Sequence, residues 1–468
     1  MKYRSSLTLT LTSFSIVFLG VGCTTDYENN SADTTGVVES DQTNHDSGTT
    51  YETDGPRALQ LTSTAPPSNL LVISVDTIRA DYVYGEAGDV ELPFIQELMA
   101  EGLVLIDHQS CSNWTIPSFY CMVTGRSTSE IGYHPTAREH NALPLEEYTL
   151  AERMVDAGFS TSFVTSNPLM TTPSGISQGF EEHILLPAAD ATEITNRALE
   201  TMESLDQSGW FSQIHYFDPH SEYNPPEQYL VGVEELEPTG VDLRDIYDIS
   251  KLRGMEEVLS PSERAALMAQ MRVYYAGELR YLDAELRRFF TRLEADGRLD
   301  NTLVLFIGDH GEQHLEHGKT QHGRDLFQEE TRVPAFFWMK NGGIEAGQWQ
   351  EVTTHTDILP TILEAMSVPY VSPDITLTGA AVGNASPNRT LTTFHAVERG
   401  SAVRVRRASH ELIYRFDGEI EVYRLSQEHT ESADLYTPGH PYIDELLESA
   451  EEAVDRLLDI ATISGPTQ

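Results

Sequence analysis

The 468-residue chain is poor in basic residues. It carries 30 Lys and Arg against 73 Asp and Glu, which gives a formal net charge of -43. A surface with this balance repels phosphate backbones, so nucleic acid and other bulk polyanions are excluded as partners. Either the substrate is small, or local positive charge in its site overcomes the overall field.

The sequence also lacks internal repeats, a dinucleotide-binding glycine motif and an apolar run suited to crossing a membrane. Its apolar stretch over residues 7–21 follows two basic residues and has the form of an export-signal core. The stretch ends in LGVGC, which resembles a bacterial lipobox and predicts lipidation of Cys23. Ordinary signal cleavage is the alternative, because Gly20 is weaker there than the usual leucine. We therefore expect a signal peptide over residues 1–22 and an exported, membrane-anchored lipoprotein of the periplasm or cell surface.

Lysine and arginine are missing from residues 23–56, and apolar residues are few there. This composition predicts a disordered acidic linker over residues 23–67. Cysteine is scarce as well: only Cys111 and Cys121 follow Cys23. A disulfide between them suits an oxidising compartment, but we favour two small buried apolar residues, because a sequence does not show their separation.

Two apolar runs are each followed by residue types that commonly bind metals. Residues 70–75 and 303–307 are short and β-branched, as in strands buried on both faces of a parallel sheet. Ligands of such sheets gather beyond the carboxyl ends of the strands, where Asp76, Asp309 and His310 fall. Two carboxylates and an imidazole suit one divalent cation, Ca²⁺, Mn²⁺, Mg²⁺ or Zn²⁺, and leave its identity open.

A hydroxyl precedes an expected helix in the segment NWTIPSFYCMVTGR. Pro117 suits the first turn of a helix running through residues 119–124, which places Thr115 at or just before the cap. Free N–H groups and the helix dipole favour an anion there. A metal contact lowers the pKa of such a hydroxyl and makes it a nucleophile. The alternative is a plain threonine N-cap.

The rest of the chain alternates strands and helices. Ser260 begins a capping box, with Pro261 in the first helical position and Gly297 as the stop, and this helix leads back to the strand at residue 303. Further expected elements are helices over residues 92–101 and 150–156, strands over 158–165 and 210–217, and a long loop over 221–259. The pattern predicts an α/β fold with a parallel sheet flanked by helices.

At this point the residues resemble a known family. The segments VDTIRAD, T-x-P-S-x-x-x-x-x-TGR, FDPH, GDHGE and THTDILPTIL occur in the order and spacing of the sulfatase family within the alkaline phosphatase superfamily. The likeness runs from residue 68 to the C-terminus. It implies an α/β catalytic domain over residues 68–370, sulfatase-like, with a mixed, mostly parallel sheet flanked by helices. It also implies a C-terminal subdomain over residues 371–468, with antiparallel strands and a terminal helix.

The resemblance also implies roles for single residues. It implies metal ligands at Asp76, Thr115, Asp309 and His310, and catalytic groups at Thr115, His220 and His322. Asp218 and His220 lie two residues apart rather than the four of two-metal relatives, so we predict one metal. His355 is either part of a second set or a helix-capping residue, and we favour the cap.

The positions that depart from the family pattern are as informative as those that match it. Thr115 replaces the Cys or Ser that becomes formylglycine, and Phe119 stands where an arginine is usual. Ser166, Asn167 and Pro168 stand where many relatives have basic residues. Thr77 replaces the second Asp of a pair, as a weak ligand or a simple strand-end hydroxyl. Oxidising a threonine gives a ketone rather than an aldehyde, so these changes favour a threonine nucleophile and phosphate over sulfate esters.

Several charged residues near the motifs have two interpretations. Arg79 and Arg126 either orient an oxyanion or tie a loop to a carboxylate, and Lys319 either meets the substrate or is solvated. We expect His314 and His317 at the rim or surface.

These observations predict an exported, metal-dependent, sulfatase-like hydrolase that cleaves a phosphate or sulfate ester through Thr115. Its expected partners are a small anionic ester and, through the lipid anchor, a membrane. One alternative is a phosphoryl-headgroup transferase, although such enzymes usually have several membrane spans before the catalytic domain. Another is a catalytically idle binding lipoprotein of the same fold.

Overall fold

The structure is a computed structural model. It describes only part of the chain. The described residues are 58–88, 90–132, 135–136, 139–140, 142–369, 376–386, 388–395, 401–425, 431 and 434–463. The expected signal peptide, Cys23 and the linker up to residue 57 lie outside them. Within these ranges, no helix combines the length and the apolarity that crossing a membrane requires.

An eight-stranded mixed sheet forms the centre, in the order β14-β2-β13-β9-β1-β8-β6-β7. β1 pairs in parallel with both β8 and β9, whereas β13 runs antiparallel to its neighbours. All residues of β1, β8 and β9 are buried, as predicted for strands covered on both faces. The strands are β1 (Asn69–Val75), β2 (Leu103–Leu105), β6 (Ser160–Thr165), β7 (Glu182–Leu185), β8 (Trp210–Tyr216), β9 (Thr302–Gly308), β13 (Ala335–Trp338) and β14 (Gly347–Trp349).

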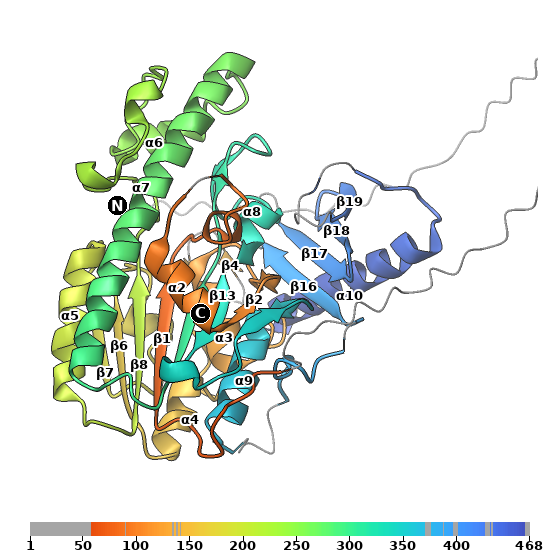
Figure 1. The fold of residues 1–468 in the computed structure, drawn as a ribbon. Helices are drawn as coiled ribbons and strands as arrows, with labels where there is room; N and C mark the ends of the chain where they lie inside the picture. Colours follow the sequence, from red (N-terminus) through yellow and green to blue (C-terminus); the bar gives the residue numbers. More distant parts are fainter. Residues whose placement is uncertain are drawn as a thin grey trace, which may run out of the picture. The chain divides into compact units, whose positions relative to one another are not determined.

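Helices cover both faces of this sheet (Figure 1). Along β1, Leu71 and Ile73 point into one core and Leu70 and Val72 into the other, as the alternation of a strand requires. The first core is closed by α2 (Pro93–Glu101), α5 (Ala191–Ser204) and α7 (Pro261–Ala295). The second is closed by α3 (Thr115–Thr124), α4 (Leu150–Asp156) and α9 (Ile358–Ala365). The mostly parallel, helix-flanked sheet predicted from the sequence is confirmed.

The long helix α7 begins as its sequence indicates. The Ser260 side chain accepts from the N–H of Glu263, and the Glu263 carboxylate accepts from the N–H of Ser260. The predicted loop over residues 221–259 is wrong in part, because it contains α6 (Ile246–Leu252) and the short 3-10 turns η2 (Glu227–Tyr229) and η3 (Val233–Glu235). α6 has no long apolar repeat that marks it, and its cap is the Asp245 carboxylate, which accepts from the N–H of Tyr247.

A second, antiparallel sheet follows near the C-terminus. It comprises β16 (Thr390–His395), β17 (Ala402–Arg407), β18 (His410–Arg415) and β19 (Ile420–Arg424), in that order, and α10 (Pro441–Ile463) packs against it. The predicted antiparallel subdomain and terminal helix are confirmed. The subdomain also contacts the loop before α3, since the N–H of Phe394 donates to the carbonyl of Cys111 at 3.1 Å.

The remaining helices and strands of the described residues are short. They are α1 (Ala80–Val83), α8 (Gln328–Thr331), β3 (His108–Gln109), β4 (Pro135–Thr136), β5 (Glu139–His140), β10 (Gln313–His314), β11 (Thr320–Gln321), β12 (Arg332–Val333), β15 (Thr353–Thr354), η1 (Thr172–Ser174), η4 (Lys340–Gly342) and η5 (His355–Asp357).

Candidate active site

Two aspartates meet at the carboxyl ends of β1 and β9. Val75 and Gly308 are partners in the parallel register, so the next residues, Asp76 and Asp309, lie side by side. The N–H of Asp309 donates to the carbonyl of Val75 at 3.1 Å, and the N–H of Thr77 donates to Asp309 Oδ1 at 3.2 Å. Both carboxylates are fully buried. The sheet edge therefore fixes the two groups that the sequence predicts as metal ligands.

Helix α3 brings the hydroxyl to the same place. Trp114 is the N-cap and Thr115 the first helical residue, one position further in than predicted, while Pro117 occupies the first turn as expected. Thr115 Oγ1 lies 3.5 Å from Asp76 Oδ2 and 3.3 Å from His310 Nε2. Three segments that are distant in the chain thus converge on one buried point.

The oxygens and nitrogens at this point fit one divalent cation. His310 Nε2 lies 3.6 Å from Asp76 Oδ1 and 3.7 Å from Asp309 Oδ2. Ligands that hold a cation through bonds of about 2.0 to 2.6 Å stand roughly 3 to 4 Å from one another. Asp76 Oδ1, Asp309 Oδ2 and Thr77 Oγ1 are buried without a hydrogen-bond partner, which a bound ion would supply.

The two carboxyls of the centre differ in their pKa values. Burial opposes ionisation of Asp76, but the hydrogen bond from His215 and the nearby His220 and His310 hold its pKa well below the ordinary value. Burial, together with the negative charge of Asp76, raises the pKa of the Asp309 carboxyl well above its ordinary value. Burial and the neighbouring His322 lower the pKa of His310 to about 3, so its imidazole is neutral, as a metal ligand must be. A divalent ion would stabilise both carboxylates in their charged form.

His215 belongs to this centre and was not predicted. It lies on β8 opposite Ser74, and its Nδ1 is 3.0 Å from Ser74 Oγ. Its Nε2 is 3.4 Å from Asp76 Oδ2, and Asp76, His215 and Asp309 present ligand atoms within 4.8 Å of one another. The signal in the sequence is a single histidine inside the otherwise buried strand WFSQIHYF. A ring that is fully buried beside a carboxylate orients that carboxylate.

Asn167 also contacts this centre. In the sequence its segment is notable only because it lacks the basic residues of many relatives, so this contact is a correction. It follows β6, and its Nδ2 donates to Asp76 Oδ2 at 2.5 Å and to Thr115 Oγ1 at 3.1 Å. The amide holds the hydroxyl oxygen in place and leaves its proton free to point at Asp76. No motif in the sequence marks this asparagine.

His220 and His322 stand together beside His310. The ring centroids of His310 and His322 are 4.5 Å apart, and those of His220 and His322 are 5.0 Å apart. His322 Nδ1 lies 3.1 Å from Glu312 Oε1, which leaves Nε2 for a ligand. Burial lowers the pKa of His220. The structure thus brings both predicted catalytic histidines to the centre and adds Glu312, the final residue of GDHGE, as the group that orients His322.

The remaining charged candidates are structural. Arg79 pairs with Asp81 and Glu316, Arg126 with Glu147, Lys319 with Asp325, and His317 lies 3.3 Å from Glu329. His314 is fully buried, so the prediction of a rim position is wrong; Tyr82, Tyr223 and Tyr275 enclose its ring. His355 is buried with Nε2 3.0 Å from the carbonyl of Gly308, and Thr354 rather than His355 caps η5.

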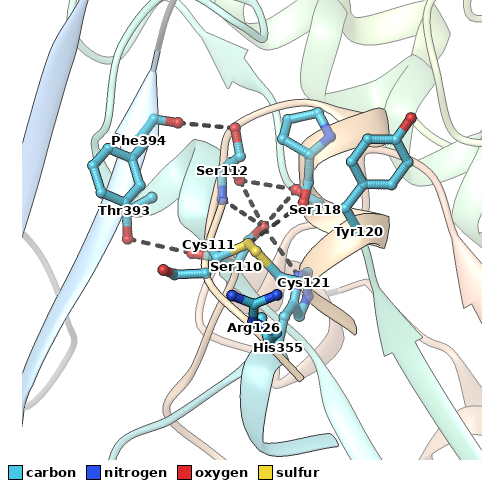
Figure 2. Close-up of a disulfide and its surroundings, with 12 residues drawn as sticks. Ser110, Cys111, Ser112, Ser118, Tyr120, Cys121, Arg126, His355, Thr393 and Phe394 are labelled. Atoms are coloured by element: carbon cyan, nitrogen blue, oxygen red, sulfur yellow. Dashed lines mark hydrogen bonds between the residues drawn. A yellow bond between two sulfur atoms is a disulfide. The ribbon is translucent and has the colours of Figure 1, made fainter. Parts of the chain in front are cut away.

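A disulfide joins the loop before Thr115 to the helix after it. Cys111 and Cys121 are bonded, with Cα atoms 6.7 Å apart, so our preference for two free cysteines is wrong. The turn of the chain into α3 brings them together, and only the fold shows that approach. Figure 2 shows that Ser110 and Ser118 interact beside the bond, and Ser110 Oγ also donates to the carbonyl of Asp309 at 2.6 Å.

Removing this disulfide is expected to destabilise the protein. A bond that closes a loop of 10 residues contributes about 2 to 3 kcal/mol, mainly by restricting the unfolded chain. The double variant Cys111→Ala/Cys121→Ala should therefore unfold at lower urea concentration than the oxidised protein. Equal unfolding midpoints, together with free thiols in the untreated protein, would contradict this.

Solved structures share the fold: a complex of BT4656 with its substrate D-glucosamine-2-N,6-O-disulfate has a TM-score of 0.65 at 17% identity, covering 84% of this chain and 98% of that chain. The phosphonate monoester hydrolase of Agrobacterium radiobacter has a TM-score of 0.62 at 16% identity, covering 84% and 96%.

The family follows from the sequence match. A model described as Sulfatase matches residues 68–368, and the chain belongs to the sulfatase family. It is 29% identical over 196 residues to an arylsulfatase of Clostridium perfringens, a match that covers 40% of this chain and 39% of that enzyme. The match thus spans about two fifths of the length of that relative.

Proposed function

We propose that this protein hydrolyses a small anionic ester through a covalent intermediate on Thr115. The observation that carries the proposal is the position of Thr115 Oγ1, 3.5 Å from Asp76 Oδ2 and 3.3 Å from His310 Nε2 at the start of α3. Asp76, Asp309, His310 and Thr115 would hold one divalent ion. When bound, the ion supplies positive charge that lowers the pKa of the hydroxyl and stabilises negative charge on the ester.

The side chains around it perform the remaining steps. Thr115 Oγ attacks phosphorus or sulfur after its proton has passed to solvent water, while Asp76 Oδ2 and Asn167 keep the attacking oxygen in line. Free N–H groups at the start of α3 stabilise the oxygens of the transition state. His220 and His322 contact the ester and stabilise its oxygens, and one of the two gives the single proton that the departing alcohol oxygen needs. Water then cleaves the bond to Thr115 and restores the hydroxyl.

The chemistry of threonine favours phosphate over sulfate esters. A secondary alcohol oxidises to a ketone, so Thr115 cannot become the aldehyde on which formylglycine enzymes depend. Phe119, where an arginine is usual in the family, is fully buried, and its ring packs against His215. The hydroxyl itself therefore remains as the nucleophile.

A substrate panel tests this proposal. Purified protein is assayed with p-nitrophenyl phosphate, bis-p-nitrophenyl phosphate and p-nitrophenyl sulfate, each with Mn²⁺, Mg²⁺, Ca²⁺ or Zn²⁺ and after chelation. We expect metal-dependent turnover that is faster on phosphate esters than on the sulfate. Faster sulfate turnover would overturn the phosphate preference, and failure to cleave any of the three would overturn the hydrolase itself.

Replacing His220 or His322 by glutamine should slow esters with poor leaving groups most. Protonation of a leaving group contributes about 10²- to 10⁴-fold for an alkoxide, whereas p-nitrophenolate leaves without help. We expect kcat for an alkyl phosphate to fall by at least about 100-fold, and kcat for p-nitrophenyl phosphate to fall far less. Equal losses on both substrates would assign these histidines to oxyanion binding alone.

We also propose export and lipid anchoring through Cys23, which rest on the lipobox-like LGVGC. The variant Cys23→Ser should leave the membrane fraction and lose incorporation of labelled fatty acid in a bacterial host. Unchanged membrane association of Cys23→Ser would contradict lipidation at this residue.

A further inference from the structure

An acidic cavity of about 400 Å³ lies next to the reaction centre. His220 lines this cavity and also stands beside His322, so the two spaces share one side chain. The residues of the cavity wall that matter here are Asp190, Phe217, Asp218, Glu222, Glu278 and Tyr281. Among the described residues that line it, none is Lys or Arg.

The carboxylates of this wall lack a positive partner. Glu278, on α7, is 3% exposed; its Oε1 accepts from the N–H of Asn224 at 2.5 Å, while its Oε2 is buried without a partner. Asp218 lies near Glu278, since its negative charge acts on the Glu278 carboxyl. Burial and the charge of Asp190 raise the pKa of Asp218 to about 7, and burial and the charge of Asp218 raise the pKa of Glu278 well above its ordinary value. Burial and repulsion between neighbouring carboxylates thus make the charged forms of both groups costly.

We infer that this cavity binds a cationic amine on the alcohol half of the ester, so that the substrate is an amino-alcohol or amino-sugar monoester. The inference rests on the proposed function. An ester held at Thr115 places its departing oxygen at His220, and the group attached to that oxygen then enters the space that His220 lines. An ammonium there donates to Glu278 Oε2 and Asp218, and the rings of Phe217 and Tyr281 provide further favourable contacts.

The charge of the whole chain fits this substrate class. A zwitterionic ester approaches a surface of net charge -43 with less repulsion than a polyanion does. A second sulfate or carboxylate on the alcohol half would meet Glu222 and Asp190 at the cavity wall. The cavity therefore selects for an amine and against a further anion.

A matched substrate pair tests the inference. O-phosphoethanolamine and propyl phosphate differ in an ammonium against a methyl group, and we expect kcat/KM to favour the amine by at least about tenfold. Glu278→Gln keeps an oxygen for the N–H of Asn224 but loses the charge, and should bring the ratio of the two kcat/KM values close to one. Glu200→Gln, on the exposed side of α5, is the control and should keep the wild-type ratio.

Asp190→Asn is the second variant, because asparagine caps α5 as aspartate does. It should lower the ratio as well, and it carries the test if Glu278→Gln does not fold. Metal-dependent cleavage of both esters with a wild-type ratio near one would overturn this inference and leave the proposed function standing.

Binding provides a readout that does not need turnover. Calorimetry with metal-loaded Thr115→Ala should show O-phosphoethanolamine binding at least about tenfold more tightly than propyl phosphate. Equal affinities would overturn the inference even if neither ester is cleaved, whereas a failure to cleave any ester counts against the proposed function.

Discussion

Thr115→Ala is expected to lower kcat for p-nitrophenyl phosphate by about 10⁴-fold or more, since removal of a nucleophile costs this much in comparable enzymes. The side chain is at the first position of α3, where alanine is a good helix former, so the protein should remain folded. The rate is measured at saturating metal with purified protein. Thr115→Ser, which keeps a hydroxyl at the same place, should retain much of the rate.

Two controls separate a lost nucleophile from a lost fold. The thermal unfolding midpoint of Thr115→Ala should stay near that of the wild type, and the variant should still bind metal through Asp76, Asp309 and His310. If Thr115→Ala keeps the wild-type rate, Thr115 is not the nucleophile.

Asp309→Asn is expected to have a comparably large effect through the metal. Loss of a residue that only orients a ligand costs up to about 100-fold in metal affinity, so loss of the ligand itself should cost at least about 100-fold. The asparagine oxygen still accepts from the N–H groups of Thr77 and His310, which Asp309 Oδ1 accepts now. The variant should therefore fold but bind metal poorly and turn over slowly.

Without metal, Asp309→Asn should not destabilise the protein, in contrast to its effect on metal binding. Two buried carboxylates repel each other when no metal is bound, and burial together with this repulsion raises the pKa of Asp309. Asp309→Asn removes this repulsion, so without metal it should be at least as stable as the wild type. Metal affinity is measured by calorimetry and stability by urea unfolding. Wild-type affinity in Asp309→Asn would exclude Asp309 as a ligand.

Much of the site can be predicted from the sequence, because its residues lie at the ends of strands and at the start of a helix that have clear sequence patterns. The buried runs before Asp76 and Asp309 define two strands, and parallel strands present their carboxyl ends at one edge. Pro117 marks the helix start that carries Thr115. The order of the motifs then indicated the family, which the match over residues 68–368 confirms.

The rest depends on contacts that local pattern does not encode. His215 faces Asp76 only because β8 pairs with β1, and Asn167 reaches Asp76 from a position 91 residues further along the chain. The Cys111–Cys121 disulfide likewise follows from the path of the chain into α3. In each case the residue type was visible, but the neighbour across the fold was not.

The most direct test of a threonine nucleophile is to trap the intermediate. Metal-loaded protein is mixed with a slow phosphate ester, quenched in acid within one turnover and digested, and the peptide that contains Thr115 is sequenced by mass spectrometry. We predict one added phosphoryl group on Thr115, which is absent in Thr115→Ala. An unmodified Thr115 during steady turnover, or a phosphoryl group on another residue, would contradict the account.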